Sequence, residues 1–262
     1  MIRECGDSDK ERVFDYIGKD YGRCLYIYID LKKISLDGDV FRAWIQEDES
    51  GRTLAVITEY YKGIQLYSRD GSIEPQEIAD FLKEKGSAMI WGMKETIDKV
   101  KALMPGFEEE VGIVGKLGDL KTDPDPKAYS ADFDELEEIV RLVAADEGIG
   151  KPYGYDSMYR QYSERMKDGF GRNFIRRDEA NGAIICHAGT YAELPELAVI
   201  GGVITAPAYR GKGFSKGTLA AVCKELLDEG KDVFSFFYIP SALRMHYGVG
   251  FEKLGDWSKI FK

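Results

Sequence analysis

The chain has 262 residues, which is enough for one or two domains. Its 44% hydrophobic and 31% charged residues exclude a wholly disordered or collagen-like chain. With 36 Lys and Arg against 46 Asp and Glu, the formal net charge is −10, so nucleic acid and anionic membrane surfaces are not expected as main partners. The longest apolar run, Leu197 to Ala206, is about half of the roughly 20 residues that cross a bilayer.

The opening segment, residues 1–12, is charged and has no apolar stretch, so we expect no secretion signal and a cytoplasmic protein. Cysteines occur without C-x-x-C spacing, which predicts reduced, buried thiols and neither a disulfide framework nor a metal site. Cys186 and His187 are adjacent and could be read as a nucleophile with its base. We expect no such pair, because neighbours on a strand point to opposite faces.

The first half is predicted to mix strands with helices. Strands are expected, from their β-branched and aromatic content, at Leu25–Leu31, Val40–Ile45, Thr53–Thr58 and Ala88–Trp91. Helices are expected at Pro75–Lys85 and Lys94–Met104. The segment Lys121–Lys127, which contains two prolines among charged residues, is predicted to be a linker between two domains.

The second half is also predicted to alternate helices and strands. Asp132 and Glu135 have the spacing of a capping box, so a helix should run to about Glu147. Further helices are expected at Ser157–Lys167, after the loop Gly150–Asp156, from about Gly213 to Gly230, and from Pro240. Strands are expected at Asn173–Arg176, Gly182–His187, Leu197–Thr205 and Asp232–Tyr238, and the chain should end in an extended segment from Phe251.

The two halves share a weak internal repeat. In the first, strand Ala88–Trp91, helix Lys94–Met104 and Gly106-Phe107-Glu108 follow one another. In the second, Val233–Phe236, Pro240–Tyr247 and Gly250-Phe251-Glu252 follow in the same order. The same unit of strand, helix and Gly-Phe-Glu is therefore predicted to occur twice, with chance similarity as the alternative.

A glycine-rich turn between a buried strand and a helix is the segment with the clearest chemistry. After Leu197–Thr205 come Pro207 and then Arg210-Gly-Lys-Gly-Phe-Ser215. The first backbone N–H groups of a helix are unpaired, and its dipole favours an anion. Gly211 and Gly213 remove side chains that would keep a phosphate away. The spacing matches neither a P-loop nor a G-x-G-x-x-G fingerprint.

Arg210-Gly-Lys-Gly-Phe-Ser215 resembles the R-x-x-G-x-G/A pyrophosphate loop of the GNAT superfamily of acetyl-CoA-dependent N-acetyltransferases, with Ser215 at the last Gly or Ala position. The following strand, short helix and Gly250-Phe251 also resemble the family. Its Asn-x-x-Ala is kept only at Ala242, with Ile239 at the Asn position. The order of elements further resembles a tandem subgroup in which a degenerate amino-terminal half precedes a competent carboxy-terminal half.

The resemblance implies a mixed α/β fold with two tandem GNAT-like domains, each a central mixed sheet flanked by helices. We expect domains at 1–124 (degenerate) and 125–262 (binding acetyl-CoA). The backbones of Val203 and Thr205 would pair with the pantetheine arm. The pyrophosphate would lie on the amides of Arg210, Gly211, Lys212, Gly213, Phe214 and Ser215.

The implied activity is direct transfer of an acetyl group from acetyl-CoA to the amine of a small molecule or peptide. In the resembling family, a Tyr at this spacing often acts as the general acid that protonates the departing thiolate. Strict spacing places His246 at that position, while Tyr247 offers a phenol one residue later. The carboxylates nearest to the position of the family's general base are Glu193 and Glu196. Alternatively, both are solvated loop charges and a water chain deprotonates the amine.

Other parts of the chain have less specific roles. The loop Tyr153-Gly-Tyr-Asp156 would frame the acceptor or decorate the surface. In the first half, Tyr60-Tyr-Lys-Gly-Ile-Gln65 has no glycine-rich helix start, so that half is expected to supply packing surface or part of an acceptor pocket. A noncatalytic acyl-CoA sensor or interaction module is the alternative to an enzyme.

Overall fold

The computed structural model describes residues 1–60, 63–149 and 153–262. It divides the chain into two compact units, Met1–Val114 with Lys253–Lys262, and Gly115–Glu252. We call them unit 1 and unit 2. The division falls between Val114 and Gly115, earlier than the expected boundary after residue 124, and it assigns the end of the chain to unit 1.

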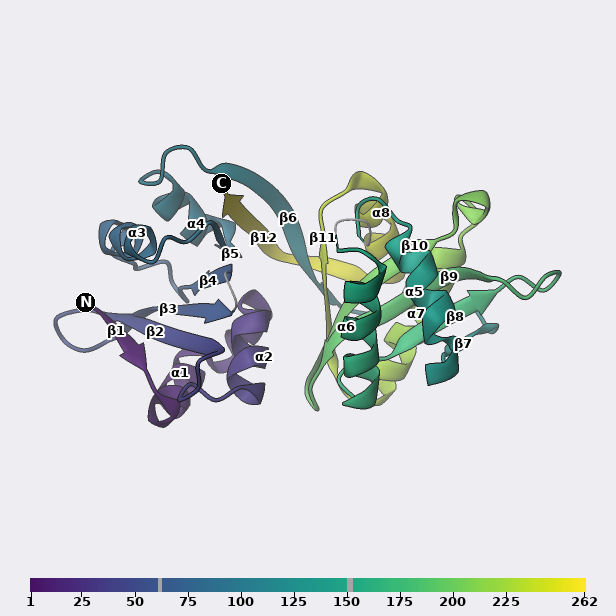
Figure 1. The fold of residues 1–262 in the computed structure, drawn as a ribbon, viewed down its shortest axis with the longest axis horizontal. Helices are drawn as coiled ribbons and strands as arrows, with labels where there is room; N and C mark the ends of the chain where they lie inside the picture. Colours follow the sequence, from purple (N-terminus) through teal and green to yellow (C-terminus); the bar gives the residue numbers. More distant parts are fainter. Residues whose placement is uncertain (61–62, 150–152) are drawn as a thin grey trace. The chain divides into compact units, whose positions relative to one another are not determined.

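The two halves of the chain repeat one order of elements, and Figure 1 follows them along the sequence. The first half runs β1 (Ile2–Cys5), α1 (Lys10–Ile17), α2 (Leu25–Lys33), β2 (Phe41–Glu47), β3 (Thr53–Tyr60), β4 (Gly63–Tyr67), α3 (Pro75–Glu84), β5 (Met89–Met93), α4 (Lys94–Lys101) and β6 (Glu108–Leu117). The second half runs β7 (Ala128–Ser130), α5 (Leu136–Ala144), α6 (Tyr155–Lys167), β8 (Asn173–Arg177), β9 (Ile184–Glu193), β10 (Leu197–Thr205), α7 (Phe214–Asp228), β11 (Asp232–Phe237), α8 (Pro240–Val249) and β12 (Phe251–Phe261). The predicted repetition of strand, helix and Gly-Phe-Glu is part of this longer repeat.

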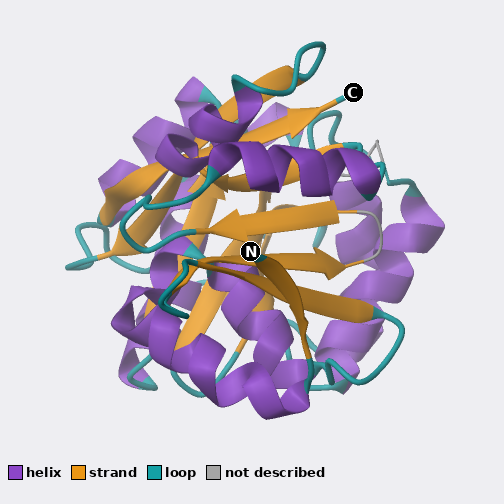
Figure 2. Cartoon of the chain, turned by 90° about the vertical axis from the view of Figure 1, so that its left-hand side faces the viewer, coloured by secondary structure: helices purple, strands orange, loops and turns teal. Residues whose placement is uncertain are grey.

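Unit 1 is a mixed sheet with helices on both faces (Figure 2). Its strands lie in the order β1, β2, β3, β4, β5, β12. Side chains such as Ile17 of α1 and Ile27 of α2 pack on one face, and Ile78 of α3 and Ile97 of α4 pack on the other. The carboxy-terminal strand completes the sheet, because β12 pairs with β5 in antiparallel register from Trp257 to Phe261.

Unit 2 has the same layers. Strands β11, β10, β9, β8 and β7 are neighbours in that order, with the end of β6 beside β11. Helices α5 and α6 share a core with Ile175 and Ile204 on one face. On the opposite face, α7 packs against the sheet, with Phe214 beside the Arg176 guanidinium. The mixed α/β fold with helix-flanked sheets is therefore confirmed.

One predicted strand is a helix. Leu25, Ile27, Ile29 and Leu31 are buried and their neighbours are partly exposed, which mimics the alternation of a strand. The segment forms α2, and a helix enclosed on most of its circumference is apolar all round. The alternation therefore arises from burial of a helix between the sheet and its neighbours, and the strand prediction was wrong.

Most other predicted elements are present within a few residues of their expected ends. The capping box of Asp132 and Glu135 is formed, and it opens a short 3-10 turn that leads into α5. Sequence reasoning missed β1, α1, β4, β6 and β7. No helix in the described parts of the chain is long and apolar enough to cross a membrane.

Candidate functional site

Strand β10 separates from β11 halfway along its length. The two strands pair in parallel from Leu197 with Asp232 to Ile200 with Ser235. Strand β10 then continues to Thr205, so its second half offers backbone groups that β11 does not use. Val203 and Thr205 lie on this second half, and both are partly exposed. The backbone of the predicted pantetheine-binding segment is thus open to a ligand.

The glycine-rich turn lies directly after this open strand. A short 3-10 turn, Pro207–Tyr209, is followed by the exposed residues Gly211, Lys212 and Gly213 and then by α7. Gly211 has φ +78° and Gly213 has φ +86°, which is left-handed backbone that favours glycine. A Cβ at either position would meet no atom within 4 Å, so the requirement for glycine comes from the backbone and not from crowding.

The amino-terminal end of α7 is suited to an anion. Gly213 is the N-cap residue and supplies no side-chain cap, and the first turn, all of which the structure describes, contains no acidic side chain. The unpaired N–H groups and the helix dipole therefore face a ligand without a competing carboxylate. Phe214 and Ser215 open the helix and are partly buried.

Arg210 and Lys212 brace the turn. The Arg210 guanidinium donates to the Thr205 carbonyl at 3.0 Å and to Asp146 at 3.3 Å, so it ties the turn to the end of β10. The Lys212 ammonium lies 5.1 Å from the centre of the Tyr209 ring. Both cations belong to an exposed turn and add positive charge beside the start of α7.

His246 and Tyr247 have contrasting surroundings on α8. The His246 ring is buried, with Nδ1 2.8 Å from the Ala242 carbonyl and Nε2 3.0 Å from the Ser235 hydroxyl. Burial lowers its pKa to about 4, so the imidazole is neutral near pH 7. It also stacks on Phe237 with ring centres 4.4 Å apart. In this tautomer Nδ1 donates and Nε2 accepts, so the ring has no spare proton.

Tyr247 is accessible to solvent beside the carboxy-terminal end of β11. Its side chain is 39% exposed, and its ring lies edge-on to Phe237, the last residue of β11. The structure therefore buries the residue at the family's usual spacing and leaves the phenol one residue later open to a ligand.

Glu193 and Glu196 lie at the other end of β10, where the strand pairs with β11 and β9. Glu193 is opposite Ala198, and Glu196 directly precedes β10. Several residues of strand, each rising about 3.3 Å, separate them from Val203. Neither carboxylate is brought to the open half of the strand.

Glu193 is also fully engaged in an ion cluster. Arg172 binds it through two nitrogens at 2.8 and 2.7 Å, and Lys231 lies 3.2 Å away. Burial alone raises the pKa of the Glu193 carboxyl, but hydrogen bonds from Arg172 and Thr190 outweigh it and bring the pKa below its ordinary value. The Glu193 carboxylate therefore stabilises this ion cluster and is not available to accept a proton from a substrate amine.

The remaining predicted residues are also located. Cys186 has its Sγ 3.4 Å from the Thr205 hydroxyl, while His187 contacts Gly202 and Asn173, so the two side chains do not form a reactive pair. Tyr153 is 63% exposed, and Tyr155 and Asp156 begin α6 instead of continuing a loop. Of the predicted loop, 150–152 lie outside the described residues. So do residues 61–62 of the segment 60–65.

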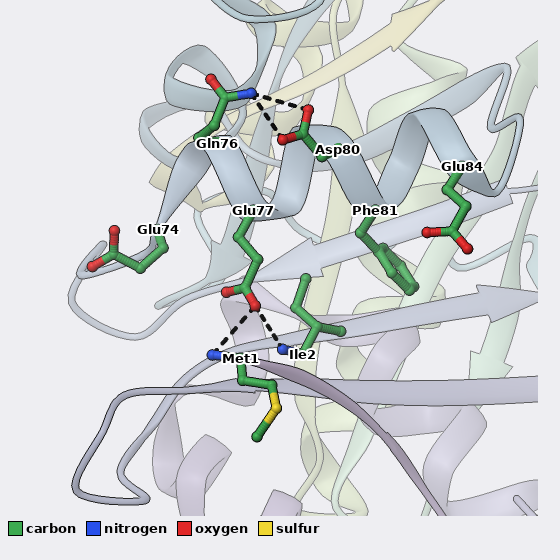
Figure 3. Close-up of a pocket in the computed structure, with 8 residues that line it drawn as sticks. All are labelled: Met1, Ile2, Glu74, Gln76, Glu77, Asp80, Phe81 and Glu84. Atoms are coloured by element: carbon green, nitrogen blue, oxygen red, sulfur yellow. Dashed lines mark hydrogen bonds and ion pairs between the residues drawn. The ribbon is translucent and has the colours of Figure 1, made fainter.

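Unit 1 has acidic side chains where unit 2 has its glycine turn. The corresponding helix, α3, has Glu74 as its N-cap residue and Glu77 in its first turn. A hollow of about 790 Å³ lies beside this helix. Figure 3 shows the side chains that line it, among them Glu74, Glu77, Asp80 and Glu84. Carboxylates at a helix start oppose a second anion. The start of α3 is therefore unsuited to a pyrophosphate.

A family model described as the acetyltransferase (GNAT) family matches residues 133–246. The chain contains a GNAT acetyltransferase domain. This match runs from the 3-10 turn before α5 into α8, ends at residue 246 and includes the glycine turn. Unit 2 is thus an acyltransferase domain of GNAT type, and acetyl transfer is its general chemistry. None of the curated protein sequences matches the chain.

Solved structures of GNAT proteins have the same fold over the whole chain. An acetyltransferase from Colwellia psychrerythraea is 13% identical with a TM-score of 0.64, and all of both chains is covered. A GCN5-related N-acetyltransferase from Sphaerobacter thermophilus is 14% identical with a TM-score of 0.66, covering 100% of this chain and 95% of the other. A tandem GNAT protein from the clavulanic acid biosynthesis pathway is 12% identical with a TM-score of 0.59, covering 100% and 98%.

Proposed function

We propose that unit 2 uses acetyl-CoA to acetylate the amine of a small molecule or peptide by direct transfer. The observation that carries the proposal is the exposed glycine turn between the open half of β10 and the uncapped start of α7. Backbone N–H groups from Arg210 to Ser215 would hold the pyrophosphate, and the backbones of Val203 and Thr205 would hold the pantetheine arm. The tandem arrangement, with a degenerate unit 1, belongs to the same proposal.

The residues of the turn fit such a cosubstrate. Gly211 and Gly213 let the backbone approach a phosphate closely, and the first turn of α7 has no carboxylate to repel it. The thioester would supply the activated acetyl group. At the point where β10 leaves β11, the N–H of Val203 is available to a carbonyl oxygen in the position of an oxyanion donor.

Tyr247 is the proposed general acid. Its partly exposed phenol, at the end of β11, would donate a proton to the departing thiolate. We do not propose a dedicated carboxylate base, because Glu193 and Glu196 lie at the far end of β10. The amine would lose its proton to water.

A thiol-release assay with acetyl-CoA and a panel of primary amines tests the proposal. Amine-dependent release of CoA thiol, with a matching acetylated product by mass spectrometry, is expected. Tight CoA binding without turnover on any amine would instead favour a noncatalytic acyl-CoA sensor.

A further inference from the structure

A bulge interrupts β10 at the point where it becomes open. Gly201 is paired with Gly189 of β9, and Ile204 is paired with His187, so β10 has one more residue than β9 across this interval. Gly202 has φ +63°, a backbone conformation that favours glycine. Among the described strand residues, Gly202 and Val203 pair with neither β9 nor β11.

His187 takes the carbonyl group of this bulge. Its ring is fully buried, and Nδ1 lies 2.6 Å from the Gly202 oxygen. A carbonyl oxygen only accepts, so Nδ1 carries the proton. Nε2 lies 2.9 Å from the side-chain oxygen Oδ1 of Asn173, which is also buried. Because the single proton of the neutral ring is on Nδ1, we assign the carboxamide rotated by 180°, so that its N–H group faces Nε2.

Two tyrosines enclose the bulge on the side of α6. A Cβ on Gly202 would lie 2.5 Å from the Tyr162 hydroxyl, which is buried. A Cβ on Gly201 would lie 2.3 Å from the Tyr191 ring. The Tyr162 ring centre lies 5.9 Å from that of His187 and 6.2 Å from that of Tyr191. The bulge therefore has little room to move toward α6.

Holding one end of a peptide unit fixes the other. The peptide bonds of the described segments are trans, so the N–H of Val203 points opposite to the Gly202 carbonyl and away from His187. Burial lowers the pKa of His187 to about 4, so the ring is neutral near pH 7 and keeps a single proton for this contact.

We propose that His187 is a positioning residue which, through the Gly202 carbonyl, aims the Val203 N–H at the acetyl carbonyl of the bound thioester. This inference rests on the proposed function. Asn173 supports it by holding Nε2 as an acceptor, which keeps the ring proton on Nδ1. His187 itself touches neither the thioester nor the amine.

The infrared carbonyl band of bound 13C-labelled acetyl-CoA is the direct test, because a stronger hydrogen bond moves it to lower wavenumber. We expect a shift in the wild type and a smaller one in His187→Ala. Turnover should fall by about 10- to 100-fold, as expected for a misplaced oxyanion donor. Affinity for CoA, which has no acetyl carbonyl, should be unchanged. His187→Asn, whose amide N–H takes the position of Nδ1, should recover part of both losses.

Thr190→Val is the matched control. It removes hydrogen bonds to the Arg172 backbone and the Glu193 carboxylate from the same strand without touching Gly202. It should leave the carbonyl band and turnover unchanged. If His187→Ala does not fold, Asn173→Ser replaces it in the same measurements. Independently, 15N NMR of the wild type should show the His187 ring proton on Nδ1.

Two results would overturn this inference while leaving the proposed function standing. One is an unchanged carbonyl band with unchanged turnover in folded His187→Ala or Asn173→Ser. The other is a His187 proton on Nε2. Failure of the wild type to bind CoA would overturn the proposed function and, with it, this inference.

Discussion

Two neighbouring residues, His246 and Tyr247, show how burial decides chemical availability. Strict spacing from Gly250-Phe251 selects His246, whereas a slip of one residue selects Tyr247, and the two side chains point about 100° apart on a helix. The structure turns His246 into the core, where Ala242 and Ser235 occupy both ring nitrogens. Tyr247 is turned outward. The sequence therefore offers two candidates for the proposed acid, and packing favours Tyr247, the more accessible of the two.

We predict that Tyr247→Phe lowers turnover by about 10²- to 10⁴-fold, because the proton donor for the thiolate is removed. CoA affinity should stay close to that of the wild type, since the glycine turn is untouched. Steady-state kinetics with a responsive amine, combined with CoA titration, measures both. Tyr129→Phe, which removes a similarly exposed phenol on β7, is the control. Wild-type turnover in Tyr247→Phe would exclude the phenol as the acid.

Glu193 marks the limit of reasoning from sequence at this scale. Its nearness to the predicted strand suggested a base, but Arg172, its main partner, lies 21 residues earlier. Such a pairing depends on the register of β8 and β9 and cannot be derived from local spacing. The same holds for His187, whose role depends on a bulge that only the register reveals.

At the scale of elements, α7 and its glycine turn were predictable because the signal is local. A buried strand, glycines and an amphipathic helix follow one another within a short stretch, and each has a physical requirement that sequence shows directly. Helix α2 was not predictable in this way. Its burial by surrounding elements, and not its own period, produced the alternating pattern.

Gly213→Ala should weaken CoA binding by about tenfold or more, because a side chain at φ +86° strains the turn and alters the amides that face the phosphate. Gly230→Ala is a close control. Gly230 follows the other end of α7, has φ +78° and would also meet nothing within 4 Å. Isothermal titration calorimetry should show loss of affinity in the first variant only. Equal affinities in the two variants would argue against the turn as the phosphate site.

At the scale of the whole molecule, the repeated order of elements was visible in outline, but the exchange of strand ends was not. Residues 253–262 belong to unit 1, and residues 115–117 belong to unit 2. Sequence motifs mark the start of β12 at Gly250-Phe251, whereas its partner β5 is set by tertiary pairing. The predicted linker at 121–127 therefore lies inside unit 2, whereas the division between the compact units falls after Val114.

The exchange makes the end of the chain part of the core of unit 1. Ile260 is fully buried in that core, whereas Leu254 on the same strand is 39% exposed. We predict that Ile260→Ala lowers the free energy of unfolding by about 2 to 4 kcal/mol. Leu254→Ala should change it by about 0.5 kcal/mol or less. Urea denaturation followed by circular dichroism compares the variants, and equal stabilities would show that β12 is not packed as described.

Acidification should weaken unit 2 relative to unit 1. Burial lowers the pKa of both histidines to about 4, so unfolded imidazoles bind protons that folded ones do not. Their contribution is therefore lost as pH falls below about 6.5, by about 1.4 kcal/mol per pH unit for each histidine. In unit 1, burial raises the pKa of Asp30 to about 7, and its contribution is instead lost as pH rises from about 4 to 7.

Amide hydrogen exchange at pH 6.5 and pH 5, corrected for intrinsic rates, distinguishes the two units. Core amides of β9 and β10 should lose protection at pH 5, while those of β3 and β4 should gain or keep it. A uniform change in both units would contradict the assignment of these buried groups.

Calorimetric titration of the wild-type protein with CoA and with acetyl-CoA tests cosubstrate binding at the glycine turn, and it does not depend on the unidentified amine. The turn, the open half of β10 and the uncapped start of α7 predict saturable binding of one molecule per chain, with a Kd of about tens of micromolar or tighter. No detectable binding of either compound at such concentrations would exclude the glycine turn as a CoA-binding site.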